Sequence, residues 1–382
     1  MISAKVLMIF IAMGLIAAAV VSAQPKTDFP DKAAGNGKGR FIAYTEKELS
    51  DAVAQGCNVV RNAKTLTAVV CPDSVAFSLG LQKDIRVYAM DTGANAQINA
   101  DDVQALGNTG AGRIVAVLDT GVDYNHVQLA DSILLGRDFV DDDNDPLDLN
   151  GHGTHVAGII TANSGQSKGV APDAKVLAVR VLDAGGSGYF SDIVAAIYYV
   201  VDGPDGINGT ADDFNADAIS MSLGTAPPYT YKGFCDSVLP SMTNAIKYAR
   251  DHNTLVVVAA GNSGSAGVSI PGCISYSTTI GAVDKFDTIA SFSGRGKAVD
   301  ITAPGVSIYS TWLNGGYAIA SGTSMSTPMV SGVAALVRAA HPTYTDDKVQ
   351  DALLKTAKDL GKLGYDTSYG WGRVDALKAV AY

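Results

Sequence analysis

Short and almost wholly apolar segments recur between helix-like segments in the part of the chain that follows Gly112. Five of them read as strands buried on both faces: residues 114–118, 176–181, 218–221, 255–259 and 278–283. Continuous apolar runs, unlike alternating ones, indicate a parallel sheet covered by helices. The sequence therefore predicts an α/β fold, a parallel sheet flanked by helices, for the larger part of the chain.

Polar residues follow two of these predicted strands. Asp119 comes directly after the first run, and Asn262 comes shortly after the fourth. Functional side chains gather at the carboxyl ends of parallel strands. A carboxylate at the end of a buried strand also needs a partner, because burying an unpaired charge is costly. The alternative is that both residues only serve turns, since each has a glycine close by.

Three short motifs supply an acid, an imidazole and a hydroxyl in that order: Asp119 in segment 117–121, His152 in segment 150–155 and Ser324 in segment 322–328. A serine hydroxyl is a poor nucleophile until an imidazole accepts its proton, and the imidazole needs a carboxylate to hold its tautomer. The pattern predicts Ser324 as nucleophile, His152 as general base and Asp119 as its orienting acid. Ser324 precedes an apolar helix over 325–339, with Pro328 in its first turn, and a helix N-terminus favours negative charge.

The other histidines do not indicate a metalloprotease. His155 lies three residues after His152, but no glutamate stands between them as in a His-Glu-x-x-His zinc motif. We expect His155 to be a structural residue of the helix that follows His152. We expect His126, His252 and His341 to be surface or packing residues.

From residue 98 to residue 382 the chain resembles the subtilisin-like serine endopeptidases (subtilases), whose catalytic residues occur in the order Asp, His, Ser. The resemblance implies that Asn262 donates its amide to the oxyanion, and that Ser222, Leu223 and Gly224 pair with an extended peptide. It also implies that Ser269 closes the primary specificity pocket. Because Ser269 is small and uncharged, we expect apolar or aromatic residues before the scissile bond. No cofactor is expected to take part in the chemistry.

The resemblance extends to calcium. Gln128 stands where the best-known calcium site of the family has an aspartate, so we do not expect that site here. A different acidic stretch resembles a calcium loop of thermitase-type subtilases, with Asp138, Asp143 and Asp145 at the ligand positions. Neighbouring carboxylates repel one another unless they are bridged, and calcium takes six to eight oxygens. The alternatives are a solvated acidic loop and, less strongly, a second acidic stretch over 202–213.

The N-terminal part divides into three segments. Residues 1–23 read as a secretory signal peptide with an apolar run over 6–21 that is shorter than a membrane span; an uncleaved anchor is the alternative. Residues 24–39 read as a flexible lead-in. Residues 40–91 predict a small α+β unit, with strands at 41–44, 65–71 and 85–89 and helices at 46–55 and 74–81. This unit resembles a ferredoxin-like subtilase propeptide, which implies an intramolecular inhibitor released by a cut between about residues 88 and 97. Residues 92–382 would form the catalytic domain of a secreted protein.

Composition limits the partners. A formal net charge of −10 argues against nucleic acid and anionic membranes as partners, so polypeptide substrates and a monomer are expected.

Four cysteines in an exported chain suggest disulfides, and four cysteines allow three pairings. If the first region is removed, Cys57–Cys71 and Cys235–Cys273 are the sensible pairs; free buried thiols are the alternative.

Two other functions are possible alternatives: a peptide-binding protein that does not cut, and an esterase. The segment around Ser324 lacks the final glycine of the esterase nucleophile elbow.

Overall fold

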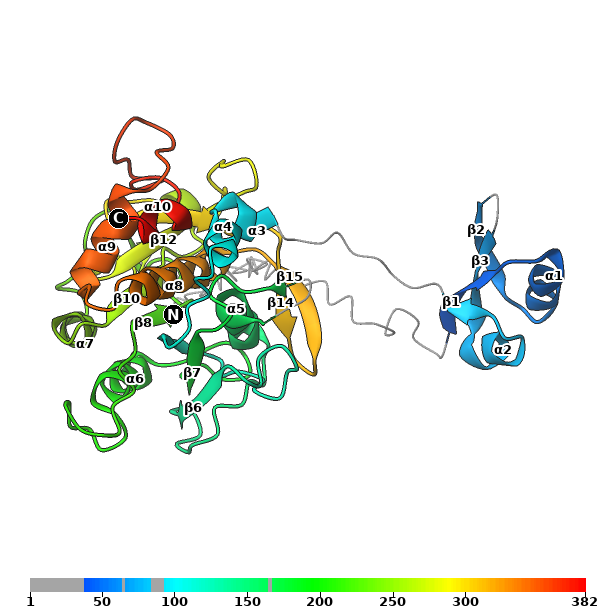
Figure 1. Ribbon diagram of the computed structural model, residues 1–382, viewed down its shortest axis with the longest axis horizontal. Coiled ribbons are helices and arrows are strands. Elements are labelled where there is room, and N and C mark those ends of the chain that lie inside the picture. The colour runs from blue at the N-terminus through cyan, green and yellow to red at the C-terminus, as the bar shows by residue number, and fades with distance from the viewer. Residues whose placement is uncertain (1–37, 64–65, 84–92, 164–166) are drawn as a thin grey trace, which may run out of the picture.

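The computed structural model describes residues 38–63, 66–83, 93–163 and 167–382 (Figure 1). These residues form a small N-terminal unit, 38–83, and a large unit, 93–382. The predicted signal peptide, nearly all of the lead-in and the predicted strand at 85–89 lie outside the described residues. Half of the segment predicted to be cut, residues 88–92 of 88–97, lies outside them too.

The N-terminal unit is a four-stranded antiparallel sheet with two helices. Its elements follow one another as β1 (Lys38–Ala43), α1 (Glu46–Ala54), β2 (Asn58–Ala63), β3 (Leu66–Pro72), α2 (Asp73–Ser78) and β4 (Gln82–Lys83). The strand order β2-β3-β1-β4 with this connectivity is the ferredoxin-like arrangement, as predicted. Strand β2 was not expected, because its sequence mixes polar and apolar residues without the alternation of a half-buried strand. The Thr45 hydroxyl and the Glu48 carboxylate form a capping box that starts α1.

The large unit is built on a seven-stranded parallel sheet with strand order β13-β12-β10-β8-β5-β7-β6. The strands are β5 (Ile114–Asp119), β6 (Ile133–Asp138), β7 (Lys175–Arg180), β8 (Ala218–Met221), β10 (Leu255–Ala259), β12 (Thr278–Val283) and β13 (Ile301–Pro304). All five predicted strands are present. The edge strands β6 and β13 were missed: β6 contains Gly136 and a charged end, and β13 is four residues long and ends in Pro304.

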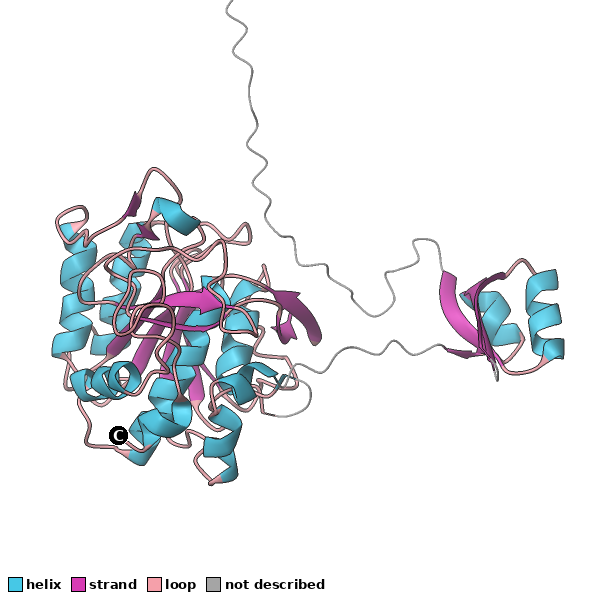
Figure 2. Cartoon of the chain, turned by 90° about the horizontal axis from the view of Figure 1, so that it is seen from above, coloured by secondary structure: helices cyan, strands magenta, loops and turns pink. Residues whose placement is uncertain are grey.

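Helices cover both faces of this sheet (Figure 2). On one face lie α5 (His152–Thr161), α8 (Thr323–Ala340), α9 (Asp346–Lys355) and α10 (Ala376–Val380), together with α3 (Gly93–Gln97) and α4 (Ala100–Ala105). On the other face lie α6 (Phe190–Asp202) and α7 (Pro240–Asp251). Successive residues of β5 alternate between the two cores: Val115 and Val117 face one, and Ala116 and Leu118 face the other. This two-sided burial is why the strands are continuously apolar.

Two small antiparallel strand pairs complete the large unit. Strand β9 (Thr230–Tyr231) pairs with β11 (Val268–Ser269), and β14 (Ile308–Trp312) pairs with β15 (Gly316–Ala320), both antiparallel. The disulfides are Cys57–Cys71 and Cys235–Cys273, so each unit carries its own bond, and the described residues hold no free cysteine. Within the described ranges, no helix has the length and apolar character needed to cross a membrane.

Candidate active site

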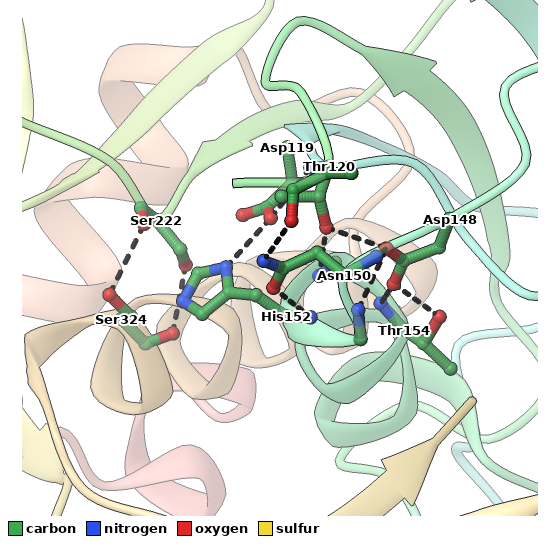
Figure 3. A network of polar contacts seen from close by, with 11 residues as sticks. Asp119, Thr120, Asp148, Asn150, His152, Thr154, Ser222 and Ser324 are labelled. Atoms are coloured by element: carbon green, nitrogen blue, oxygen red, sulfur yellow. Dashed lines mark hydrogen bonds and ion pairs between the residues drawn. The ribbon is translucent and has the colours of Figure 1, made fainter. Parts of the chain in front are cut away.

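Asp119 and His152 meet at the carboxyl end of the sheet. Asp119 is the last residue of β5 and its side chain is fully buried, while the His152 side chain at the start of α5 is 27% exposed. The Nδ1 atom of His152 lies 2.7 Å from Oδ1 of Asp119, which also accepts the Thr120 N–H at 2.8 Å. Figure 3 shows the imidazole between Asp119 and Ser324. The geometry fixes the proton on Nδ1 and leaves Nε2 free to accept one.

The local sequence explains how His152 is held. Gly151 precedes it at φ 109°, a left-handed conformation that favours glycine, and a Cβ there would enter the ring of Trp312 on β14. The hydroxyls of Ser310 and Thr311, also on β14, donate to the carbonyls of His155 and Thr154, each at 2.8 Å. The β14 strand therefore packs closely on the first turn of α5.

The two histidines of this helix have opposite electrostatic environments. Burial disfavours protonated His152, but the Asp119 carboxylate, its hydrogen bond and the Asp148 carboxylate together raise the pKa of the imidazole. Burial, together with His152 nearby, lowers the pKa of His155 to about 3. His155 is therefore neutral, and its Nε2–H donates to the carbonyls of Ile308 and Ala318. The structural role expected for His155 agrees with these contacts.

Ser324 faces the same cleft but makes a different hydrogen bond. Its hydroxyl donates to the Ser222 carbonyl at 3.2 Å (Figure 3), and within the described residues no hydrogen bond joins it to His152. Catalytic hydrogen bonds of this kind often form fully only with substrate. The helix also begins earlier than expected, at Thr323, so Pro328 is its sixth residue and not in its first turn. Because Pro328 has no N–H, the carbonyl of Ser324 is free to accept the Ser222 hydroxyl at 2.8 Å.

Asn262 is oriented by Thr323. The N–H and the hydroxyl of Thr323 both donate to Oδ1 of Asn262, at 3.0 and 3.1 Å. The Thr323 hydroxyl in turn accepts the N–H of Gly261 at 3.1 Å. Since Oδ1 is held by two donors, the amide nitrogen of Asn262 is the atom left to donate into the cleft. It lies beside the first turn of α8, where backbone N–H groups have no helical acceptor.

Six of the catalytic and substrate-binding candidates share one cleft of 710 Å³. His152, Ser324 and Asn262 line it, and so do Ser222, Leu223 and Gly224, which follow β8. Ser269 lies behind this cleft. Its side chain is fully buried against Gly224 and Gly261, and within the described chain its hydroxyl has no hydrogen-bond partner. The large apolar side chains that line the cleft are Leu182, Phe190, Ile193 and Leu223.

Arg180 neutralises part of the negative charge of the acidic stretch that contains Asp138, Asp143 and Asp145. Asp138 accepts the N–H groups of Val140 and Asp141 with one oxygen and Arg180 with the other, the latter at 2.5 Å. The remaining calcium candidates point to other donors: Asp143 accepts the N–H of Asp145, and Asp145 accepts the Tyr124 hydroxyl. No three Asp, Glu, His or Cys side chains of the described residues are grouped to hold a metal ion. In this arrangement the three predicted carboxylates belong to no such group, and Asp138 is engaged by Arg180.

Four residues that orient the predicted catalytic groups were not expected from the sequence. Asp148, Thr120 and Thr154 form a buried network beneath His152, and Thr323 orients Asn262. Each stands within four residues of a predicted catalytic residue. That proximity was the only signal available, because Thr and Asp are also ordinary turn and helix-start residues.

The chain is similar to known proteases over most of its length. The Subtilase family matches residues 110–372. Thermophilic serine proteinase of Bacillus sp. (strain AK1) is 42% identical over 275 residues, which cover 71% of this chain and 62% of that protein. Thermitase of Thermoactinomyces vulgaris is 40% identical over 276 residues, 72% of this chain and 90% of thermitase. Subtilisin E of Bacillus subtilis (strain 168) is 38% identical over 291 residues, 74% of this chain and 70% of that protein.

Proposed function

The chain belongs to the subtilase family of serine endopeptidases, and we propose that it is an exported enzyme that cuts polypeptides through Asp119, His152 and Ser324. The observation that carries this proposal is the 2.7 Å contact between His152 and Asp119, with His152, Ser324 and Asn262 lining one cleft. A protein that only binds peptides has no need of this arrangement.

The proposed reaction is acyl transfer in two steps. Ser324 Oγ attacks the peptide carbonyl carbon as its proton passes to Nε2 of His152, and Asp119 stabilises the resulting imidazolium. The negative oxygen of the tetrahedral intermediate accepts from the Asn262 amide and the Ser324 N–H. The C–N bond then breaks as His152 gives its proton to the leaving amine. Water releases the acyl group in the same way, so no cofactor is proposed for catalysis.

Substrate binding is proposed to free the nucleophile. The Ser222 carbonyl accepts the Ser324 hydroxyl when no peptide is bound. An extended peptide pairing with Ser222, Leu223 and Gly224 would offer its own N–H groups to this backbone. The Ser324 hydroxyl would then be released to donate to His152.

The decisive experiment compares the full chain with its Ser324→Ala variant. Wild type should shed its N-terminal region and react with a fluorophosphonate probe, whereas the variant should remain full length and unlabelled. A folded wild-type protein that neither reacts with the probe nor processes itself would exclude the proposal. Purified Ser324→Ala that still processes itself would exclude Ser324 as the nucleophile.

The substrate preference is proposed to be apolar or aromatic before the scissile bond. Apart from His152, no ionisable side chain is among the described residues that line the cleft, and Ser269 fills the space behind two of its glycines. A basic residue would find no carboxylate there. Digestion of a peptide library should therefore show cuts after apolar and aromatic residues. A dominant preference for Arg or Lys would contradict this.

Several finer properties follow from the resemblance and are proposed with it. The N-terminal unit is an inhibitor of the catalytic unit, the signal peptide directs secretion, and the mature enzyme is a monomer with no nucleic-acid or membrane partner.

Structural calcium at Asp138, Asp143 and Asp145 is proposed from the sequence alone, and its binding would require Arg180 to release Asp138. Thermal melts with calcium and with a chelator test it. An unchanged melting temperature would remove calcium from the proposal.

A further inference from the structure

Asp148 is a buried carboxylate just before the helix that carries His152. Only 3% of the residue is exposed. One of its oxygens accepts the N–H groups of Asn150 and Gly151, at 2.8 and 2.9 Å. The other accepts both the N–H and the hydroxyl of Thr154, at 2.9 and 2.6 Å. These contacts satisfy donors at the start of α5 that have no partner within the helix.

The same carboxylate also reaches the segment that follows Asp119. The Thr120 hydroxyl donates to Oδ1 of Asp148 at 2.9 Å, and the Gly153 N–H donates to that hydroxyl at 2.9 Å. A second link runs from the Asp123 N–H to the Thr154 hydroxyl at 2.8 Å. Figure 3 shows Asp148, Thr120 and Thr154 beside the contact between Asp119 and His152.

We propose that Asp148 is a positioning residue of the catalytic centre: its carboxylate ties the segment after Asp119 to the first turn of the His152 helix and so fixes the distance between those two side chains. Asp119 and His152 come from elements that are separate in the sequence. Their direct contact is one hydrogen bond. Asp148 adds a second link, because it accepts the Thr120 hydroxyl from the segment after Asp119 and four donors from residues 150–154 around His152.

The charge of Asp148 gives this role a distinct signature. The ionisable groups that act on His152 or respond to it are Asp119, Asp148 and His155. Asp148 favours the protonated imidazole, so replacing it with a neutral residue should lower the pKa of His152. A residue that only stabilises the fold would leave that pKa unchanged.

The test uses Asp148→Asn, which keeps the size of the side chain but removes its charge and one pair of acceptor sites. We expect kcat on a peptide substrate to fall at least tenfold with KM changed less than threefold, since misplacing a catalytic group by about 1 Å can cost about 10²-fold. We also expect the acid limb of the pH profile to move to lower pH. Thr120→Val, which removes one bridge, should show a smaller loss of kcat in the same direction.

Asp300→Asn is the matched control. Asp300 is also a carboxylate that accepts a backbone N–H, that of Thr279 at 2.7 Å, but it lies away from the cleft. It should leave both kcat and the acid limb in place. The proposal is overturned if Asp148→Asn keeps wild-type kcat, or if its acid limb stays in place. If Asp148→Asn does not fold, an unchanged kcat in folded Thr120→Val overturns it.

This inference rests on the proposed function, so one measurement is made without activity. In the full-length Ser324→Ala chain, the downfield Nδ1–H resonance of His152 can be followed by proton NMR as a function of pH. Adding Asp148→Asn should lower the pKa it reports and broaden the resonance. An unchanged titration contradicts the role of Asp148, whereas a wild-type chain without peptidase activity contradicts only the proposed function.

Discussion

At the scale of single residues, the titration of His152 links the structure to activity. The base must be neutral to accept the Ser324 proton, and the Asp119 carboxylate raises the pKa of the imidazole above its ordinary value of 6.5 despite burial. The activity should therefore fall as the pH falls, with a midpoint above 6.5. The pH dependence of kcat/KM measures this midpoint for the free enzyme.

Asp119→Asn tests the cause of that shift. The amide cannot stabilise the imidazolium, so the midpoint should move below the wild-type value and kcat should fall by about 10⁴-fold. The protonation of His152 has opposite effects on stability and on activity. A raised pKa in the folded state means that the protonated form of His152 stabilises the fold at pH values below 6.5, and that this contribution is lost as the pH rises through the folded pKa. An acid limb unchanged in Asp119→Asn would refute the assignment.

Residue by residue, the sequence predicted the groups that carry chemistry better than the groups that hold them. Asp119, His152 and Ser324 stand in motifs with unusual neighbours, and three such motifs in one order are specific. Asp148 and Thr323 act through hydrogen bonds to backbone groups, which many Asp and Thr residues make in any protein. The bond from Ser324 to Ser222 depends on competition among acceptors in the cleft, which no motif encodes.

At the scale of secondary-structure elements, burial determined what could be predicted. The central strands β8, β10 and β12 are buried at every position, so their apolar runs were clear. Strand β6 is an edge strand in which Leu135 is exposed and only two positions are buried, and its pattern resembles a loop. The start of α8 was misplaced because Thr323 and Ser324 look like capping residues, whereas the helix extends through both of them.

The packing of β14 on α5 gives a prediction for Gly158. A Cβ at this position would overlap the hydroxyls of Ser310 and Thr311, which cannot retreat without breaking their bonds to α5. Gly158→Ala should therefore destabilise the protein by about 1–3 kcal/mol, although alanine is the better helix former. Guanidinium unfolding of the variant in a Ser324→Ala background measures this.

Gly233→Ala is the control for that experiment. A Cβ at Gly233 meets no atom within 4 Å, so the same chemical change should alter stability by less than about 0.5 kcal/mol. If Gly158→Ala is as stable as Gly233→Ala, β14 is not packed on α5 as described. Such an outcome would also weaken the account of how His152 is held.

At the scale of the whole molecule, each unit has its own core and its own disulfide. The N-terminal unit has a small core in which Phe41, Val69 and Leu81 are the large members, and a unit of this size needs a covalent support. Cys57–Cys71 supplies it. The sequence predicted this division from the succession of short strands and helices over 40–91 and from the resemblance to a propeptide. The boundary near residue 92 lies beside residues outside the described ranges.

The second disulfide should affect both stability and substrate binding. Cys235–Cys273 closes a sequence separation of 38 residues, which corresponds to about 3–4 kcal/mol of stability in the chain-entropy account. Cys273 donates its N–H to the Ser269 carbonyl at 2.9 Å, so the disulfide also anchors the segment behind the cleft. A variant with Cys235→Ser and Cys273→Ser should melt at a lower temperature and show a larger rise in KM than fall in kcat.

The Cys57→Ser and Cys71→Ser variant is the control for this experiment. After release of the N-terminal unit it should match wild type in melting temperature and in KM. Equal melting temperatures and equal KM values for the two variants would show that the pocket wall is held by the β9–β11 pairing and the fold alone.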